Sequence, residues 1–174
     1  VPRKQTQTDA EGTHVAKYDC MVGIPTVVSD ESTQILFNRM NSWLEFKICN
    51  EEEGPITVKS VTLESENGEL VYKGSVDIIA VDGDSYMSVR PSLKAEKLTA
   101  LTEGNWCTIA PGGDIVVRAA ILPYDCSGSG LIISVETDKG VSAKRYWGMN
   151  FRPGNVYTMT MSNSNYKNVD GNVK

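Results

Sequence analysis

Few side chains in this sequence have the types and spacing that chemistry needs. His14 is the single histidine among 174 residues, and it follows a polar stretch at residues 1–13. A Ser-His or Cys-His nucleophile pair could form only through this residue. The stretch CSGSG at 126–130 lacks the G-x-S-x-G spacing of a nucleophile elbow, and neither glycine-rich phosphate-binding pattern occurs. The sequence predicts a protein that is not an enzyme and uses no cofactor.

Acidic residues and cysteines offer no clear metal site. Asp82 and Asp84 in VDGDS could present oxygens to calcium, but the spacing of a calcium-binding loop is missing, so a plain Asp-Gly turn is favoured. The acids of NEEEG at 50–54 are better explained as a solvated turn. The cysteines are not in the close pairs of a zinc site. Free thiols are favoured, while an even count leaves disulfides open. The four cysteines are Cys20, Cys49, Cys107 and Cys126.

Three tryptophans are candidates for ligand contact. Trp43, Trp106 and Trp147 lie in different predicted strands, and Trp43 shares the outward phase of Glu45 and Lys47. Exposed aromatic rings can form a platform on which sugars stack. The competing interpretation is that the rings close the ends or the seam of a sandwich.

The charge of the chain excludes one class of partner. Acidic residues number 22 against 17 basic residues, the net charge is −5, and no basic stripe occurs. Nucleic acid is therefore not expected as a partner. The sequence also has no apolar run close to the ~18 residues that span a membrane.

Alternation of apolar and polar residues indicates many short strands. In WLEFKIC at 43–49, Leu44, Phe46 and Ile48 alternate with polar residues, as in a half-buried antiparallel strand. The phase of ITVKSVTLES at 56–65 slips near Lys59 and Ser60, which predicts a β-bulge. These patterns predict one core, formed by Leu44, Phe46, Ile48, Val61, Leu63, Ile115, Val117 and Tyr157.

Turn residues predict how the strands connect. Hairpins are expected at Asn67-Gly68, at PGGD (111–114) and at DKG (138–140). In the last strand, FRPGNVYTMTM at 151–161, a positive φ at Gly154 would let the chain turn sharply. Together the elements predict an all-β protein, a Greek-key β-sandwich. We expect a flexible lead-in at 1–13, the sandwich at 14–162 and a flexible tail at 163–174.

Two stretches resemble a known family. YDCMVGIPTVVSDESTQILFNRMNSWLEFKI, from Tyr18, and DKGVSAKRYWGMNFRPGNVYTMTM, to Met161, are similar in order and spacing to the Bacteroidales fimbrillin (type V pilin) family. Asn155 stands where the family often has lysine. The chain matches about one of the two transthyretin-like sandwiches that such proteins usually have.

The resemblance implies a function. It implies a fimbrillin-like pilus subunit or accessory component at the cell surface or outer membrane, exported as a lipoprotein and acting in adhesion through strand-mediated assembly. Its partners would be other fimbrial subunits or a second copy, or surface glycans or proteins. Membrane contact would require a lipid anchor that this chain lacks. Proteolytic cleavage after an arginine is also implied, with Arg3 as the candidate. The alternative is a carbohydrate-binding β-sandwich module on the cell surface.

Overall fold

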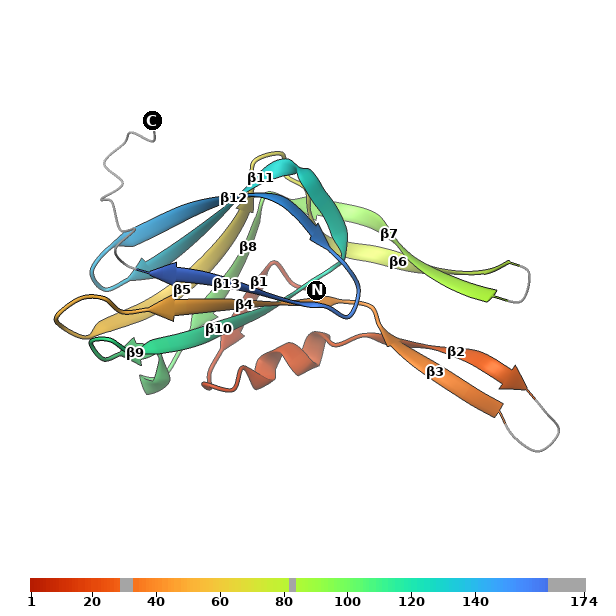
Figure 1. Cartoon of the computed structure of the whole chain (residues 1–174), viewed down its shortest axis with the longest axis horizontal. Helices are drawn as coiled ribbons and strands as arrows, with labels where there is room; N and C mark the ends of the chain where they lie inside the picture. The colour runs from red at the N-terminus through yellow and green to blue at the C-terminus, as the bar shows by residue number, and fades with distance from the viewer. Residues whose placement is uncertain (29–32, 82–83, 163–174) are drawn as a thin grey trace.

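The computed structural model of the chain describes residues 1–28, 33–81 and 84–162. Strands dominate it, and the expected all-β sandwich is confirmed (Figure 1). Neither short 3-10 helix in the described part of the chain has the length or apolar character needed to cross a bilayer. In chain order the elements are β1 (Lys4–Gln7), η1 (Thr13–Tyr18), β2 (Met21–Val28), β3 (Thr33–Arg39), β4 (Ser42–Cys49), β5 (Ile56–Ser65), β6 (Leu70–Val81), β7 (Asp84–Ala95), β8 (Lys97–Thr102), η2 (Asn105–Cys107), β9 (Thr108–Ile109), β10 (Asp114–Ile121), β11 (Tyr124–Thr137), β12 (Val141–Phe151) and β13 (Val156–Ser162).

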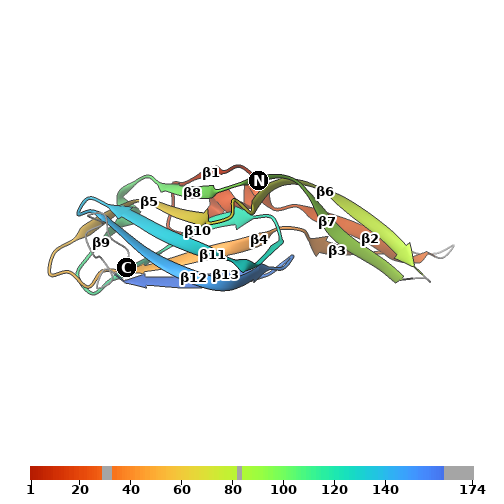
Figure 2. The same cartoon turned by 90° about the horizontal axis from the view of Figure 1, so that it is seen from above.

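Two sheets enclose one core (Figure 2). The larger sheet has the strand order β1-β8-β5-β11-β12, with β9 also paired to β5. The smaller sheet has the order β10-β4-β13. The chain passes from one sheet to the other between β4 and β5, β9 and β10, β10 and β11, and β12 and β13. Strands adjacent in a sheet are therefore often distant in sequence.

The alternation in β4 is preserved in three dimensions. Leu44, Phe46 and Ile48 are buried, while the residues between them are half-exposed. Of the eight predicted core residues, six are buried, and Ile115 and Tyr157 are half-buried against the same core. Tyr157 stays partly exposed because its hydroxyl group bonds to main-chain groups at the sandwich margin.

The β-bulge predicted near Lys59 is confirmed. Val58 and Val61 are both buried although they are three positions apart. Strict alternation would place them on opposite faces. The pairing of β5 with β11 shifts at the same place, between Glu136 and Thr137. The extra residue lets both halves of β5 face the core.

Only one of the three predicted hairpins forms as expected. β11 and β12 pair antiparallel around the turn at 138–140. Asn67-Gly68 does make a tight turn, with Gly68 at φ +67°. The strands on its two sides do not pair with each other, because β5 pairs with β8, β9 and β11, while β6 pairs with β7. The turn at 111–114 likewise sends β9 and β10 to different sheets. The turn residues set where the chain reverses, and burial of the apolar faces decides which strands pair.

The expectation of a flexible lead-in is wrong for residues 4–7. These residues form β1, which pairs in parallel with β8. Gln5 and Gln7 are buried, and their carboxamides replace a strand partner for β10. Gln5 accepts a hydrogen bond from Ala120 N at 2.9 Å and donates one to Ala120 O at 2.7 Å. Gln7 accepts one from Arg118 N at 2.7 Å. These bonds satisfy main-chain groups of β10 on the edge that has no strand neighbour. The predicted tail at 163–174 lies outside the described residues.

The turn before the last strand has the predicted backbone. Gly154 adopts φ +73°, a region that other L residues rarely occupy. Met159 and Met161 then face the core, while Thr158 and Thr160 are exposed. β13 pairs in parallel with β4, which the sequence did not predict.

Candidate functional site

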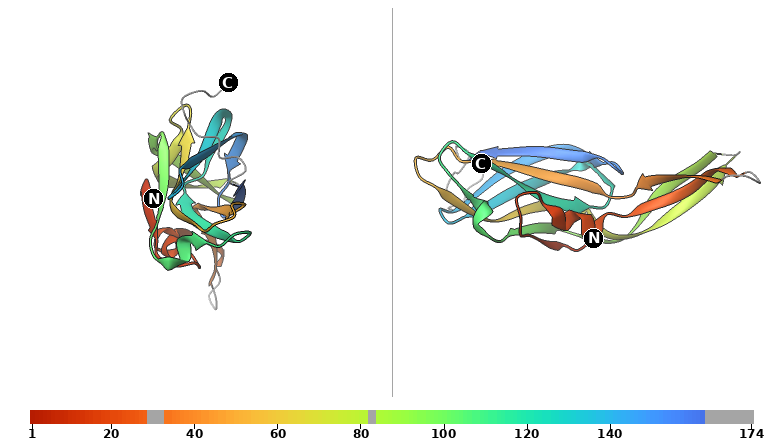
Figure 3. Two further views of the ribbon diagram at one scale, coloured as in Figure 1. Left: turned by 90° about the vertical axis from the view of Figure 1, so that its left-hand side faces the viewer. Right: turned by 90° about the horizontal axis from the view of Figure 1, so that it is seen from below.

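Two long hairpins project from one end of the sandwich. In the described part of the chain, β2 pairs with β3 alone and β6 with β7 alone, so neither hairpin belongs to a core sheet. Figures 1 and 3 show both hairpins extending in the same direction away from the sandwich. We refer to β2–β3 as the first arm and to β6–β7 as the second arm. The arms form the most distinctive surface of the molecule.

The first arm exposes an apolar face. Met21, Ile35 and Phe37 are each more than half exposed, with Phe37 at 62%. Gly23 lies opposite Phe37 in the ladder. A Cβ at position 23 would lie 2.7 Å from Ile35 Cγ2 and 3.0 Å from Phe37 Cε1. Glycine at position 23 thus leaves space for the side chains of Ile35 and Phe37, which lie across the first arm and are exposed to solvent.

The first arm also lacks the charges that usually protect strand edges. Residues 21–28 and 33–38 include no Asp, Glu, Lys or Arg. Natural edge strands are normally blocked by charges, proline or bulges, because unpaired N–H and C=O groups attract other strands. Pro25 and the adjacent register shift protect β2. β3 has neither a proline nor a charge before Arg39, and a two-stranded ribbon is only marginally stable alone.

The second arm is more polar and is tied to the sandwich. Arg90 pairs with Asp77 across it at 2.8 Å. Near its base, Lys94 donates a hydrogen bond to the hydroxyl of Tyr124 on β11, and its ammonium lies 4.2 Å from the centre of that ring. The hydrogen bond to Tyr124 raises the pKa of Lys94. The second arm therefore carries charged groups of the kind that protect strand edges, which residues 21–28 and 33–38 of the first arm lack.

A joint of several contacts fixes the root of the first arm. Arg39 Nε lies 2.8 Å from a carboxylate oxygen of Asp19, and the guanidinium carbon lies 4.7 Å from the centre of the Trp43 ring. Met40 N donates to Cys20 O at 2.7 Å. The two ends of the arm are thereby tied together and to the start of β4. This geometry holds the arm at a defined angle to the sandwich.

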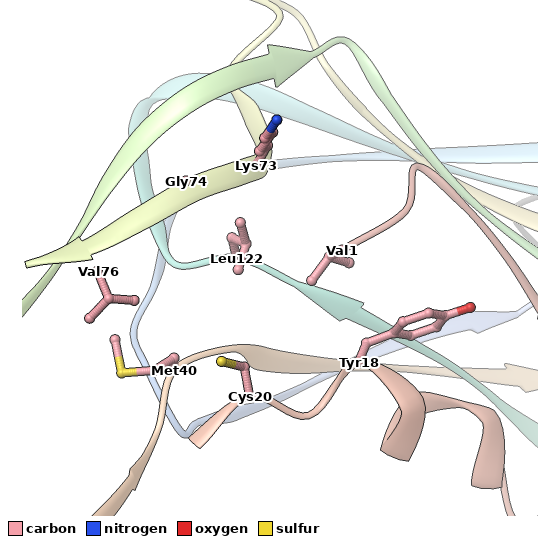
Figure 4. Close-up of a pocket in the computed structure, with 8 residues that line it drawn as sticks. All are labelled: Val1, Tyr18, Cys20, Met40, Lys73, Gly74, Val76 and Leu122. Atoms are coloured by element: carbon pink, nitrogen blue, oxygen red, sulfur yellow. The ribbon is translucent and has the colours of Figure 1, made fainter. Parts of the chain in front are cut away.

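A pocket of about 220 Å³ lies between the roots of the two arms (Figure 4). Its walls are mainly apolar, and four of the lining residues carry a polar group: Val1, Tyr18, Cys20 and Lys73. The lining residues are Val1, Tyr18, Cys20, Met40, Lys73, Gly74, Val76 and Leu122. No set of converging carboxylates or hydrogen-bond donors marks it as a catalytic cleft.

The three predicted aromatic candidates do not form a platform. Trp43 lies on the outward phase of β4 in the smaller sheet, whereas Trp147 lies on β12 in the larger sheet and is 60% exposed. The Arg145 guanidinium covers one face of Trp147 at 3.8 Å. Trp106 belongs to η2, packs against the core and donates its N–H to Glu103 O at 2.8 Å. The geometry does not favour the carbohydrate-binding alternative.

Arg3 directly precedes β1, the edge strand of the larger sheet. Its carbonyl oxygen accepts a hydrogen bond from Thr99 N at 2.8 Å. Its guanidinium lies 5.2 Å from the centre of the Tyr72 ring, and the residue is exposed. A protease would have to release this main-chain contact to cut there, and cleavage after Arg3 stays a prediction.

The remaining chemical candidates are separate from one another. His14 is buried and neither ring nitrogen has a hydrogen-bond partner. The four cysteines are free thiols, and burial raises the pKa of Cys126 to about 11, which keeps it unreactive. Among the described residues, no three His, Cys, Asp or Glu side chains gather as metal ligands would. Asp82 lies outside the described residues, and the side chain of Asp84 is not described.

Side chains partly cover the edges of the sandwich itself. Tyr146 on β12 donates to Thr160 O on β13 at 3.2 Å. Tyr157 on β13 donates to Asn150 O on β12 at 2.8 Å. These two tyrosines join the edges of the two sheets on one side, as Gln5 and Gln7 do on the other. Within the described part of the chain, the uncharged edge of the first arm is thus the more accessible to a partner strand.

The molecule belongs to the class of all-β sandwiches, here with two projecting arms. No protein-family model and no curated protein matches the sequence. Solved structures with a similar arrangement include a protein of Bacteroides ovatus ATCC 8483, provisionally described as a cell adhesion protein. It is 14% identical, with a TM-score of 0.43, over 74% of this chain and 42% of that one. Another, from Bacteroides fragilis NCTC 9343, has the same description, 12% identity and a TM-score of 0.43, over 80% of this chain and 44% of that one. The chain spans less than half the length of either protein.

Proposed function

We propose that this protein is a surface adhesion or structural protein, a fimbrillin-like pilus subunit or accessory component that acts through strand-mediated contacts. The observation that supports this function most directly is the first arm, a two-stranded ribbon with no charged residue at 21–28 or 33–38 and with exposed Ile35 and Phe37. The sequence resemblance to the fimbrillin family supports export to the cell surface. The partners would be other fimbrial subunits or a second copy of the chain.

The chemistry of the arm suggests how a partner binds. A strand added to β3 would satisfy its unpaired N–H and C=O groups and extend the ribbon into a three-stranded sheet. Side chains of the added strand would cover the exposed rings and methyl groups of the arm. Main-chain bonds would supply affinity, and the apolar face would supply specificity. The joint at Arg39 would pass tension from the partner into β4.

A pair of matched variants tests this proposal. Phe37→Lys places a charge on the apolar face of the first arm, while Val141→Lys places one at an exposed position on β12. Both side chains are exposed, so neither change is expected to unfold the protein. A photo-crosslinker at position 37, with position 141 as the control, would be used on producing cells together with sedimentation velocity of the purified chain.

The expected result is specific to the arm. Position 37 should crosslink to a second copy or to a surface subunit, and Phe37→Lys should reduce association at least tenfold while Val141→Lys leaves it unchanged. Crosslinking at both positions alike, or full assembly of Phe37→Lys, would contradict contact through the arm.

A further inference from the structure

The short helix η1 connects the sandwich to the first arm. It packs against β1 and β10, and two residues after its end the chain enters β2. Asp19, the residue that follows η1, donates its N–H to Ala16 O at 3.2 Å and pairs with Arg39 at the root of the arm. Any movement of η1 therefore acts directly on the joint that holds the arm.

Two side chains of η1 are buried, Val15 and the imidazole of His14. His14 is only 5% exposed, yet neither Nδ1 nor Nε2 has a hydrogen-bond partner. A buried polar group without a partner is costly, and a buried charge without a partner is far more costly. The ring of Tyr18 meets it edge-on at 6.5 Å between ring centres. The Arg118 main chain and the Asp9 carboxylate favour a charged ring, but burial acts more strongly against the charge, so the site favours a neutral ring.

The charged groups around the ring are occupied or repulsive. From the preceding loop, the Asp9 carboxylate accepts hydrogen bonds from the main chain and hydroxyl of Thr13. From β10, Arg118 adds positive charge, and its guanidinium donates to Glu11 O at 2.8 Å and to Glu45 on β4 at 3.0 Å. Lys17 adds a second positive charge from η1 itself.

The charged residues at the ends of the neighbouring strands lie elsewhere. Lys4 on β1 is exposed on the face of the strand opposite to Gln5 and Gln7. Asp114 is at the far end of β10 from Arg118 and pairs with Lys47. An imidazolium at position 14 would find no uncommitted carboxylate among these groups.

We propose that His14 makes η1 an acid-sensitive latch, in which protonation of the buried ring releases η1 from β1 and β10 and loosens the root of the first arm. This inference does not depend on the proposed function. It concerns only the coupling between one titratable side chain and the position of the arm.

The direction of the effect follows from proton linkage. Burial lowers the pKa of His14 below its ordinary value, with Lys17 and Arg118 acting in the same direction and the Arg118 main chain and Asp9 in the opposite one. The open state exposes the ring, so its pKa returns to about 6.5. The open state therefore binds the proton first. The closed state is fully favoured above about pH 6.5 and loses stability as the pH falls toward the lower pKa of the closed state.

Hydrogen exchange of single amides measures this opening. The probes are the amides of Val15 in η1, of Asp19 directly after η1 and of Met40 at the arm root, each of which donates a main-chain hydrogen bond. Amides of the β11–β12 ladder are the internal reference. After correction for intrinsic exchange rates, protection of the three probes should fall by up to about tenfold between about pH 7.5 and about pH 5.5. The reference amides should keep their protection.

Two variants and a direct titration decide the outcome. His14→Phe keeps a ring but cannot be protonated, and His14→Gln is a smaller neutral replacement; in either folded variant the pH response of the probes should be lost. Because His14 is the only histidine, its ring signals in NMR need no assignment, and they should titrate below pH 6.5. A ring that titrates at or above its ordinary value, or a pH response that both variants retain, would overturn the latch.

Discussion

Single residues at the turns decide how the chain leaves one strand and enters the next. The positive φ at Gly154 was predictable, because a Pro-Gly-Asn turn before an alternating strand requires a permissive residue. The role of Gly23 was not, because the need for glycine there comes from Ile35 and Phe37 on the neighbouring strand. A contact between two strands is not visible in the sequence until their register is known.

Gly154→Val should destabilise the protein by about 1–3 kcal/mol, because a β-branched residue resists the left-handed backbone. No atom lies closer than 3.8 Å to a Cβ at this position, so the cost is backbone strain and not a clash. Urea unfolding measures the change. Gly54→Val is the control, since position 54 has open space and no positive φ. Equal stability of both variants would contradict the prediction.

The thiols should differ strongly in reactivity. Cys20 is exposed and should react first with a thiol reagent at about pH 8, while the buried thiol of Cys126, with its pKa of about 11, should react slowly. In urea without reductant all four cysteines should react. A count below four in urea would show that disulfides form.

At the scale of secondary-structure elements, local sequence patterns predicted where strands form more reliably than which strands pair with each other. The alternation of β4 and the bulge of β5 were read from the sequence because each depends on which side chains face the core. The failed hairpins at 67–68 and 111–114 show the limit, since a turn does not specify which sheet receives the next strand. β1 was missed because its buried residues, Gln5 and Gln7, are polar. Their period-two spacing was the available signal.

The arms were also beyond the sequence alone. Their strands have the composition of core strands, so the residues of β2 and β3 could not be told apart from a segment of the sandwich. The three tryptophans predicted as candidate site residues lie on different elements and do not form one surface. The surface that supports the proposed function instead consists of residues that were predicted only to form strands. Only their exposure in the folded molecule distinguishes them.

The side-chain hydrogen bonds from Gln5 and Gln7 to the main chain of β10 can be tested by mutation. Gln7→Leu keeps the size of the side chain but leaves Arg118 N and Val116 O without their side-chain partner. Stability should fall by about 1–3 kcal/mol, because buried main-chain groups lose hydrogen bonds. Thr6→Val, on the opposite face of β1, is the matched control. If both variants unfold at the same denaturant midpoint as the unmodified chain, the Gln7 hydrogen bonds do not stabilise β10.

At the scale of the whole molecule, acid should destabilise the fold. The hydrogen bond from the Thr13 side chain lowers the pKa of Asp9, and the one from the Thr57 main chain lowers the pKa of Asp138. Because these folded-state pKa values lie below those of the unfolded chain, the stability they contribute is present above about pH 4 and lost as the pH falls through the folded values. The melting temperature should fall in that range, and Asp138→Asn should flatten part of the decline. If the melting temperature of Asp138→Asn falls with pH as that of the unmodified protein does, Asp138 does not contribute to the acid sensitivity.

Calcium should not change the stability of the molecule. The sequence around Asp82 and Asp84 lacks the ligand spacing of a calcium loop. Calorimetry with calcium and with a chelator should therefore give the same transition. A shift of several degrees would indicate that Asp82 and Asp84 bind the metal.

The parallel pairing of β13 with β4 has a consequence for how the protein is made. Val156 lies beside Trp43, 113 positions earlier in the chain (156 − 43). Contacts between such distant segments form slowly, because a long loop must close before the contact can stabilise it. Until β13 emerges from the ribosome, β4 lacks one neighbour and the apolar face around Leu44 and Phe46 cannot be fully covered. The sandwich is therefore completed only when the chain has been synthesised through β13, and a chain truncated before Val156 should be a substrate for chaperones and proteases.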